Sequence, residues 1–572
     1  MLLPKKPARN DPKIKSSPTF VDLYLGTSPL AHFSSPSLVT SQLQFTFQPQ
    51  APAMAISVES CVLDSSLVLW LTLASLAFAL MHLRLTRRGA PLPPGPRPLP
   101  IIGNMLMMDQ LTHRGLAALA ARYGGLLHLR LGRVHTVVVS SPEYAREVLQ
   151  VQDGEFSNRP ASIAIAYLTY DRADMAFSHY GHFWRQVRKL SAVKLFSRRR
   201  AQSWLAVRDE SAALVRTIAR SAGEAVDLGE LIFGLTKHVI FRAAFGTRDG
   251  GGHDELVALL QEFSTLFGAF NIGDFIPWLA WVDPHGINKR LRAARAALDG
   301  VIGRIIDEHV NNAGDGDADM VDDMLAFIDG EVDPAGREQC GGELQGTLRL
   351  TRDNIKGIIM LAQDFIFGGT ETVASAIEWA MAELLHSPGD LRRLQKELAD
   401  VVGLGRGVEE ADMDKLDFLK CVAKETLRLH PPIPLLLHEA AADCVVGGYS
   451  VPRGSRVMIN VWSVGRDHGA WKDADAFRPA RFMPGGEAAG LDLKGGCFEF
   501  LPFGSGRRAC PAIVLGLYEL ELVVARLVHA FDWALPDDMR AEELDMEDAF
   551  GLTAPRAARL RAVATPRLNC PL

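Results

Sequence analysis

The sequence predicts a mainly α-helical body with small β-sheets, preceded by an amino-terminal transmembrane helix. Two observations predict the body: apolar residues recur at three- and four-residue intervals through most of the chain from Leu111 onward, and strand-like runs are few. A third observation predicts the membrane helix, because the run "SLVLWLTLASLAFALMHL" from Ser66 to Leu83 contains no Asp, Glu, Lys or Arg. At 572 residues the chain has room for several domains or for one large helical unit.

Composition narrows the possible functions. With 48% hydrophobic residues and a formal net charge of −6, the chain resembles an ordinary globular protein and lacks the basic surplus typical of proteins that wrap nucleic acid. Its cysteines are odd in number, scattered and without a C-x-x-C pair, which argues against a disulfide scaffold or a zinc finger and favours a reducing compartment. The cysteines are Cys61, Cys340, Cys421, Cys444, Cys497, Cys510 and Cys570.

Residues 1–53 are rich in Ser and Pro and poor in acidic residues, and the stretch "MAISVES" at Met54 is a more natural start. We interpret residues 1–53 as an extension that is disordered or not normally translated. A transit peptide is the alternative that this composition leaves open.

The predicted membrane anchor covers residues 62–83, and its apolar run is long enough to span a bilayer if tilted or slightly extended. Arg84, Arg87 and Arg88 follow the run directly, which places its carboxyl-terminal side in the cytosol. A cleaved signal peptide is the rival interpretation, but its charges should precede the run and a small-residue cleavage site should follow it. Residues 84–100 are basic and proline-rich and form a stiff hinge, which leaves residues 101–572 for the body.

Within the body, "LLHLRLGRVHTVVVS" from Leu126 predicts a hairpin around Gly132, and "SRVMINVW" from Ser455 predicts a later strand. The stretch "NKRLRAARAALDGVIGRIIDEHV" from Asn288 has the period of a helix. The acidic stretch that follows it could suggest calcium. A loop opened by Asp315 would, however, have Met at its sixth position and Ala at its twelfth, so we reject a calcium site there.

The first candidate motif is "DFIFGGTETV", which ends at Val373 inside a stretch of helical period. Two glycines in a helix interior cost about 1 kcal/mol each relative to Ala. A closely approaching flat cofactor would explain them, as would a locally opened helix that accepts a small ligand or water. Glu371 and Thr372 stand beside that point as a carboxylate and a hydroxyl able to relay protons. A kinked helix with surface-facing polar residues is the alternative.

The second motif is "KETLRLHPPIP", in which Glu425 and Arg428 lie three residues apart on one helical face before a proline stop. Most such pairs are solvated and nearly neutral in energy. Arg481, in "FRPARF", could join the pair in a buried bidentate network.

The third motif is "FGSGRRACPA", in which Phe503, Gly506, Arg508 and Cys510 follow the order F-x-x-G-x-R-x-C. A thiolate that binds iron needs nearby amides and positive dipoles, and glycines let the backbone wrap around the sulfur. The helix expected after the motif adds its positive end. A Cys thiolate as the axial ligand of heme favours cleavage of the O–O bond, so this motif points to oxygen activation.

With these motifs in this order, the chain from the anchor to its end resembles the membrane-bound cytochromes P450, which are heme-thiolate monooxygenases. The resemblance implies a cytochrome P450 fold, heme b (iron protoporphyrin IX) as the cofactor, and electrons from NADPH through NADPH–cytochrome P450 reductase on the same membrane. It also implies a single-pass protein of the endoplasmic reticulum membrane whose catalytic domain faces the cytosol.

The resemblance further implies roles for individual residues. Cys510 would be the axial ligand of the heme iron, Arg508 would hold a heme propionate, and Trp184 and Arg188 in "HFWRQVRKL" would reach propionates, as would His438 in "LLLHEA". The implied cofactor-binding set is Cys510, Arg508, Trp184, Arg188, His438, Phe503 and Gly506.

Two further sets of residues are implied. Thr372 and Glu371 would be catalytic and would deliver protons to dioxygen. Glu425, Arg428 and Arg481 would form a structural lock behind the heme.

Four stretches outside the heme motifs resemble the plant ferulate 5-hydroxylases, also called coniferaldehyde 5-hydroxylases. They are "GNMLMMDQLTHRGLA", "SNRPASIAIAYLTYDRADMAF", "FSTLFGAFNIGDFIPWL" and "FGLTAPRAARL". The implied reaction is the NADPH- and O2-dependent 5-hydroxylation of guaiacyl phenylpropanoids (coniferaldehyde, coniferyl alcohol and ferulate), whose products feed syringyl lignin and sinapate esters. A flat phenol would then bind among residues 162–167, 367–370 and 433–436.

The reductase would be a partner on the same membrane. Arg185, Lys189, Arg198, Arg199 and Arg200 form a basic patch that would help to steer an acidic partner, although a solvated helical face is nearly as good an interpretation.

The chain departs from the family pattern at Ala512, where Gly is usual, and this methyl could weaken heme loading by overpacking. Val373 replaces a second hydroxyl residue, which we treat as minor. Three other functions stay open: a monooxygenase of another plant phenolic or flavonoid, a heme-thiolate isomerase or dehydratase that needs neither O2 nor reductase, and a catalytically silent heme protein. The pair Glu371 and Thr372 argues against the isomerase.

Overall fold

The computed structural model describes residues 58–86, 90–194, 201–245, 271–283, 286–311 and 361–571, together with the single residues 259, 262 and 266. The chain divides into two units, Met1–Gly89 and Ala90–Leu572. Three interpretations fall outside the described residues: the extension at 1–53, the acidic stretch with its rejected calcium loop, and the arginines at 198–200.

The first unit contains the helix α1 (Val58–Thr86). Its described apolar side chains are exposed; Trp70, for example, is 70% exposed. The hydroxyls of Thr72 and Ser75 donate to carbonyls one turn earlier in the helix. Among the residues that the structure describes, no helix combines the length and the apolar character needed to cross a membrane.

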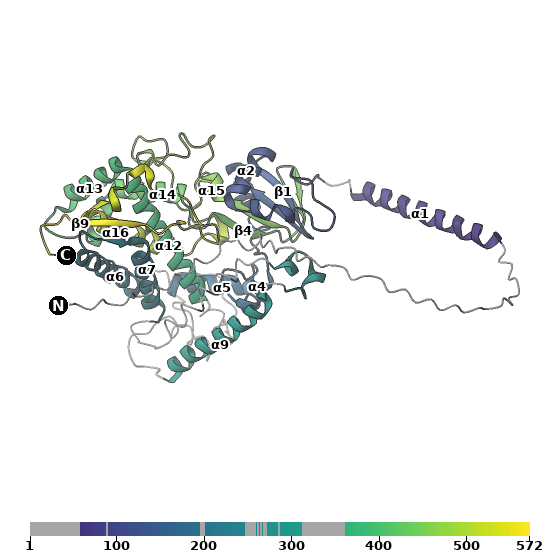
Figure 1. Cartoon of the computed structure of the whole chain (residues 1–572), viewed down its shortest axis with the longest axis horizontal. Coiled ribbons are helices and arrows are strands. Elements are labelled where there is room, and N and C mark those ends of the chain that lie inside the picture. The colour runs from purple at the N-terminus through teal and green to yellow at the C-terminus, as the bar shows by residue number, and fades with distance from the viewer. Residues whose placement is uncertain are drawn as a thin grey trace, which may run out of the picture. The chain divides into compact units, whose positions relative to one another are not determined.

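Helices make up most of the second unit (Figure 1), which confirms the mainly helical class. The α-helices are α2 (His113–Tyr123), α3 (Pro142–Arg146), α4 (Ile163–Leu168), α5 (His182–Lys194), α6 (Ala201–Arg220), α7 (Leu228–Phe245), α9 (Ile287–Asn311), α12 (Leu361–His386), α13 (Pro388–Val402), α14 (Asp417–Leu429), α15 (Val461–Val464) and α16 (Ile513–Ala530). Shorter helical segments are η1 (Met105–Gln110), η2 (Glu147–Val151), η3 (Ile272–Asp274), η4 (Pro277–Leu279), η5 (Glu410–Lys415), η6 (Pro479–Phe482), η7 (Gly506–Arg508), η8 (Pro536–Asp538) and η9 (Ala541–Glu543).

The main core lies around α12, which packs against α7, α13, α14 and α16. From residue 374 to 385 every residue of α12 is buried, including the polar residues Ser375, Glu378 and Glu383. Trp379, at 0% exposure, lies at the centre of this stretch. The segment that carries the cysteine motif leads directly into α16, so the core fixes one end of the cysteine loop.

The strands form three small sheets among the described residues. They are β1 (Leu126–Leu131), β2 (Val134–Val139), β3 (Ala225–Asp227), β4 (Leu435–Glu439), β5 (Cys444–Val446), β6 (Tyr449–Val451), β7 (Arg456–Asn460), β8 (Phe531–Ala534) and β9 (Arg561–Pro566). The orders are β1-β2-β7-β4, β3-β9-β8 and β5-β6. In the first sheet β2 and β7 are parallel, whereas β4 is antiparallel to β7 and pairs His438 with Val457.

Several sequence predictions are confirmed. The hairpin is β1 and β2, which turn at Gly132 with a φ of +57°, a conformation that glycine adopts without strain. The strand expected from Ser455 is β7, and the helix expected from Asn288 is α9. The sequence did not predict β4, although it holds the candidate His438, because its pairing with β7 joins distant segments.

The proline-rich segment of the expected hinge lies against the body. The amide of His128 donates to the Pro94 carbonyl at 2.8 Å, and the amide of Ser450 donates to the Pro91 carbonyl at 2.8 Å. The Asn104 side chain donates to the Pro96 carbonyl at 3.3 Å. These bonds attach residues 91–96 to β1 and β6.

Candidate functional site

The cysteine loop surrounds a free thiol with backbone groups. The amide of Cys510 donates to the Phe503 carbonyl at 2.9 Å, which closes the loop, and the amide of Ala512 donates to the Cys510 sulfur. Gly504 and Gly506 have φ values of +70° and +66°, which side chains rarely tolerate. A Cβ on Gly506 would lie 2.6 Å from the Leu149 carbonyl oxygen, so this glycine also permits a close approach.

Electrostatic effects on the Cys510 thiol oppose one another. Burial raises its pKa, whereas the Ala512 amide and the positive charge of Arg188 lower it. The loop therefore supplies two groups that favour a thiolate, but they do not outweigh burial. A cation bound at the sulfur would deprotonate the thiol, which is the behaviour required of a metal ligand.

Ala512 begins α16 with φ −101° and ψ 19°. This conformation lies outside the left-handed region, so the methyl causes no backbone strain. The amide of Gly516 donates to the Ala512 carbonyl at 2.9 Å, and the helix therefore starts normally.

Arg508 is 8% exposed, and its guanidinium lies over the ring of Trp184, 4.6 Å from the ring centre. It donates to the carbonyls of Ser157 at 2.7 Å and Met175 at 3.1 Å, and also to that of Ser178. The indole N–H of Trp184 donates to the same Met175 carbonyl at 3.0 Å. The cysteine loop is thereby joined to the segment that precedes α5.

Two more of the predicted cofactor-binding residues, Arg188 and His438, lie near the cysteine loop and Arg508. Arg188 donates to the Ala509 carbonyl, and its guanidinium lies 5.7 Å from the ring centre of Trp184. His438 is buried and its Nδ1 lies 2.7 Å from the Phe156 carbonyl oxygen. Burial, followed by the charge of Arg159, lowers the pKa of His438 well below its ordinary value, so the ring is neutral at pH 7.

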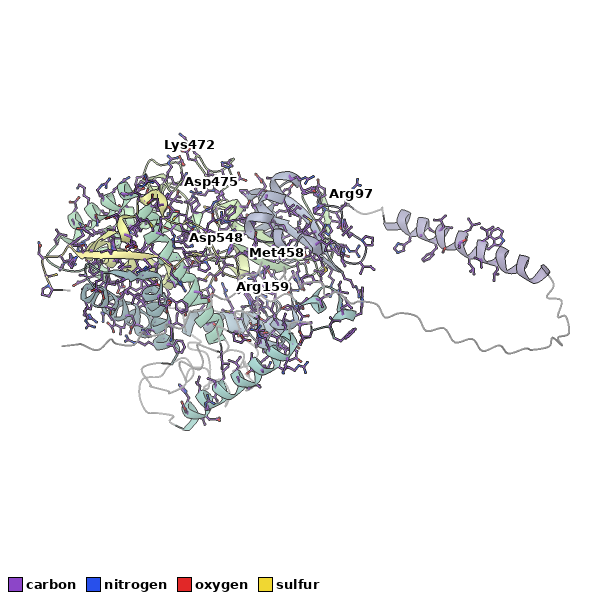
Figure 2. All side chains as sticks on the ribbon, viewed as in Figure 1. Arg97, Arg159, Met458, Lys472, Asp475 and Asp548 are labelled. Carbon is purple, nitrogen blue, oxygen red and sulfur yellow. The ribbon has the colours of Figure 1, made fainter. Side chains whose placement is uncertain are left out.

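Arg159, labelled in Figure 2, belongs to this group but was missed in the sequence. It donates to the carbonyls of Ala176 and Leu437 and acts electrostatically on both His438 and Arg508. A single arginine before a proline carries no signal in the sequence, because only folding brings Leu437 to it. We call Arg159, Arg188 and Arg508 the carbonyl-paired cluster.

The carbonyl-paired cluster is suited to an anionic ligand. Burial, then repulsion from Arg159, lowers the pKa of Arg508 to about 9, and burial also lowers the pKa of Arg188. The nearby carboxyl of Asp174 balances them only in part, because burial raises its pKa to about 7. Its Oδ2 atom is buried without a hydrogen-bond partner. Three arginines beside a thiol at a helix start fit heme b, whose two propionates would supply the missing negative charge.

The lock predicted from the sequence is present as a buried network. Both carboxylate oxygens of Glu425 accept from Arg428 at 2.8 Å, and one also accepts from Arg481 at 3.0 Å; all three side chains are 0% exposed. Arg481 also pairs with Glu487 at the rim. Backbone carbonyls take the remaining bonds, for example that of Gly465 at 2.6 Å from Arg428. We call Glu425, Arg428, Arg481 and Glu487 the carboxylate-paired cluster.

The glycines of α12 serve two different purposes. A Cβ on Gly369 would lie 2.5 Å from Ile240 Cδ1, so this glycine allows α7 to pack closely. A Cβ on Gly368 would meet no atom of the described residues within 4 Å, so these residues leave open space beside this glycine. The helix is continuous through both residues, and the hydroxyl of Thr372 donates to the Gly368 carbonyl.

Glu371 lies beside Thr372 but has a separate partner. Its Oε2 accepts from the hydroxyl of Thr553 at 3.0 Å. Burial raises the pKa of Glu371, while Thr553 and Arg559 lower it less strongly. The sequence did not predict Thr553, because it lies 182 residues away.

The motifs converge in the fold. A Cβ on Gly516, in the first turn of α16, would lie 3.8 Å from Val373 Cγ2, so the helix after the cysteine loop passes beside the end of the glycine motif. The helix α14, which carries Glu425 and Arg428, packs against both α12 and α16.

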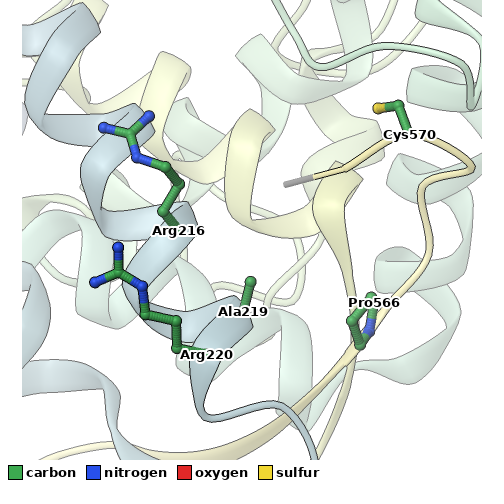
Figure 3. A pocket seen from close by; sticks show the side chains of 5 residues that line it. All are labelled: Arg216, Ala219, Arg220, Pro566 and Cys570. Carbon is green, nitrogen blue, oxygen red and sulfur yellow. The ribbon is translucent and has the colours of Figure 1, made fainter.

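Of the expected pocket segments, residues 433–436 approach the cysteine loop most clearly: Leu436 Cδ1 would lie 3.4 Å from a Cβ on Gly504. Residues 163–167 belong to α4, which packs on α9. The side chain of Phe367 lies outside the described residues. A separate cavity of about 390 Å³ is lined by Arg216, Ala219, Arg220, Pro566 and Cys570 and contains none of the predicted site residues (Figure 3).

Comparison with known proteins agrees with this arrangement. The family model for cytochrome P450 matches residues 93–559, and the chain belongs to the cytochrome P450 family. It is a heme-thiolate monooxygenase, an oxidoreductase with heme b as its cofactor, and it receives electrons from NADPH through a reductase.

Plant enzymes are among its relatives. The chain is 60% identical to cytochrome P450 84A1 of Arabidopsis thaliana over 85% of this chain and 94% of that protein, and 38% identical to a flavonoid 3'-monooxygenase of the same plant over 88% and 98%. Among solved structures, a zebrafish cytochrome P450 with progesterone has a TM-score of 0.66 and 27% identity, covering 80% of this chain and 99% of that one.

Proposed function

We propose that this protein catalyses the 5-hydroxylation of guaiacyl phenylpropanoids (coniferaldehyde, coniferyl alcohol and ferulate) in syringyl lignin and sinapate biosynthesis. One observation carries the proposal. Two of the stretches that resemble ferulate 5-hydroxylases lie against the shared motifs: residues 157–177 accept bonds from Arg508, and residues 550–560 contact α12. Residues that distinguish this family thus border the site where the shared chemistry takes place.

The arrangement of the side chains supports these proposed roles. Cys510 would bind the heme iron, the carbonyl-paired cluster with Trp184 and His438 would hold the propionates, and the carboxylate-paired cluster would stabilise the fold behind them. Heme, when bound, would supply oxygen activation and the transfer of one oxygen atom to a ring C–H position, while the other oxygen atom leaves as water with electrons from NADPH. Glu371 and Thr372 hold and move protons beside the open space at Gly368. Phe503 and Gly506 shape the loop around the sulfur.

We also propose a single-pass anchor in the endoplasmic reticulum membrane, with the catalytic unit in the cytosol. The apolar run from Ser66 to Leu83 and the arginines after it support this topology. In the second unit, Trp278 and Trp281 are 55% and 81% exposed, an arrangement typical of aromatic residues at a membrane interface. Extraction of microsomes with alkaline carbonate tests the anchor: release of the full chain into the supernatant would contradict it.

The decisive assay uses microsomes that contain the full chain, a plant NADPH–cytochrome P450 reductase and NADPH. We expect 5-hydroxylated product from at least one of coniferaldehyde, coniferyl alcohol and ferulate, and none after omission of NADPH. Cys510→Ala serves as the matched inactive control. Absence of product from all three substrates, with a normal carbon monoxide difference spectrum, would overturn the proposed substrate class.

The second candidate substrate class is the flavonoids, because relatives about 38% identical over most of the chain are flavonoid 3'-monooxygenases. Flavonoids in the same assay therefore decide between the two classes. Product without NADPH would instead support an isomerase, and loss of the thiolate-type carbon monoxide band would support a silent heme protein.

A further inference from the structure

Glu371 is oriented by a residue from the far end of the chain. Its Oε2 atom accepts a hydrogen bond from Thr553 Oγ1 at 3.0 Å, and Thr553 is 5% exposed. The hydroxyl of Thr372, next to Glu371 in the sequence, is directed instead to the Gly368 carbonyl. The orientation of this carboxyl group therefore depends on Thr553.

The backbone around Thr553 is fixed without the help of its hydroxyl. The Ala554 carbonyl accepts from the indole N–H of Trp379 at 3.1 Å and from Ser375 Oγ at 3.5 Å, while the Ala554 amide donates to the Pro432 carbonyl at 2.9 Å. Ser375 and Trp379 follow Glu371 by four and eight residues, so all three lie along one face of α12. The loop is thus anchored to this face at three successive turns.

The charges beside Glu371 are few. Arg559, from the same carboxyl-terminal segment, favours the carboxylate, but it pairs with Glu378 Oε2 at 3.1 Å and its charge is partly neutralised. Glu378 accepts a second bond from the Leu560 amide at 2.8 Å. Burial disfavours the ionised form of Glu371, and the hydrogen bond from Thr553 favours it.

We propose that Thr553 is a positioning residue that holds Glu371 in the orientation needed for proton delivery. Its hydroxyl occupies Oε2 and leaves Oε1 as the oxygen that exchanges protons during turnover. This inference rests on the proposed proton-relay role of Glu371, and it gives a function to the stretch "FGLTAPRAARL" that the shared heme motifs do not.

The test compares Thr553→Val, which keeps the shape and removes the hydroxyl, with Thr553→Ser, which keeps the hydroxyl. Ser375→Ala is the matched control, because it removes a parallel bond to the same loop without touching Glu371. In the holoenzyme with reductase, we expect Thr553→Val to lower product formed per NADPH consumed about tenfold and to increase hydrogen peroxide release. Thr553→Ser and Ser375→Ala should stay within about twofold of the unmodified protein.

A second measurement needs no turnover. Infrared difference spectroscopy follows the carboxyl band that Glu371→Gln abolishes as the pH is changed. Because the Thr553 bond favours the carboxylate, its loss in Thr553→Val should move this titration to higher pH, and Thr553→Ser should restore it.

A double-substitution cycle identifies the path of the effect. In a protein that already carries Glu371→Gln, adding Thr553→Val should cause little further loss of product formed per NADPH consumed. An equal loss in both backgrounds, equal losses in Thr553→Val and Ser375→Ala, or an unchanged infrared titration would overturn the inference. If flavonoids prove to be the substrates, product formed per NADPH consumed is measured with a flavonoid instead. Failure of the proposed substrate class can therefore be distinguished from failure of the proposed role of Thr553.

Discussion

The two buried arginine clusters of this protein are neutralised in different ways. In the carboxylate-paired cluster, Glu425 takes bonds from Arg428 and Arg481, and Glu487 takes another from Arg481. In the carbonyl-paired cluster, the guanidinium groups donate to backbone carbonyls. Carbonyls satisfy the donors but carry no net charge, and the two carboxyls that act on Arg508 balance it only in part: burial raises the pKa of Asp174 to about 7, and Asp153 also pairs with Arg507.

This difference separates a structural role from a binding role. A buried cation whose charge is only partly balanced costs free energy, and the lowered pKa values of Arg508 and Arg188 reflect their burial. A dianionic ligand would remove this cost. The first cluster has no comparable demand, because its carboxylates are already in place.

The largest expected effect comes from a substitution in the carboxylate-paired cluster. Glu425→Gln leaves Arg428 and Arg481 buried at 0% exposure, with Glu487 at the rim as the carboxylate that still pairs with Arg481, and such a loss typically costs about 3–5 kcal/mol of unfolding free energy. We expect little folded protein, measured as soluble yield and as the urea midpoint of whatever is recovered.

Glu487→Gln is the matched control for this prediction, because it also removes a carboxylate from Arg481 but lies at the rim, 35% exposed. Its expected cost is about 1 kcal/mol or less. If the two variants were equally stable, the carboxylate-paired cluster would not be the lock that we describe.

Breaking the carbonyl-paired cluster should have a smaller effect, and on a different property. Arg508→Met removes a cation whose burial is costly, together with its hydrogen bonds to three carbonyls, so the protein without heme should lose less stability than in Glu425→Gln. Heme should dissociate about 10- to 100-fold faster, as expected for loss of a charge-assisted bond. Transfer of heme to apomyoglobin measures this rate.

Arg507→Met is the control for Arg508→Met, since Arg507 is adjacent in the sequence but pairs with Asp153 at 2.6 Å and is 44% exposed. Its heme release should be unchanged. An equal increase of the heme dissociation rate in both variants would mean that the overall positive charge of the loop, and not the carbonyl-paired cluster, retains the heme.

The contrast between the clusters also shows what the sequence can and cannot predict. The short spacing of Glu425 and Arg428, and of Arg508 and Cys510, is visible because these residues are neighbours on one helix or one loop. Arg159 was not predictable, because its relation to Arg508 is created by the fold alone. The mainly helical class and the β1–β2 hairpin were predictable from local periodicity.

Glu519 shows the cost of burying a charge when no charged neighbour compensates it, the cost that the carboxylate-paired cluster offsets. Burial raises the pKa of Glu519, on α16, from 4.5 to about 8. Between these values the unfolded chain is ionised and the folded protein stays protonated, so this group's contribution to stability is complete below pH 4.5 and is lost as the pH rises toward 8.

Between these pH values, Glu519 should lower the free energy of unfolding by about 1 kcal/mol for each unit that the pH rises. Glu519→Gln should remove this pH dependence. Urea unfolding of both proteins at several pH values provides the measurement. An identical pH dependence in the two proteins would show that Glu519 ionises normally.

The smallest expected effect is at Ala512, because its backbone conformation does not require glycine. Its φ of −101° is open to any L-residue, and its amide already serves the Cys510 sulfur, so glycine would gain no backbone freedom that the fold requires. Ala512→Gly should therefore change heme occupancy by less than about twofold and unfolding free energy by about 1 kcal/mol or less. The carbon monoxide difference spectrum per mole of protein measures the occupancy. A several-fold rise in the thiolate-type band would mean instead that the methyl itself obstructs the heme, and that the silent protein was the correct interpretation of the unmodified chain.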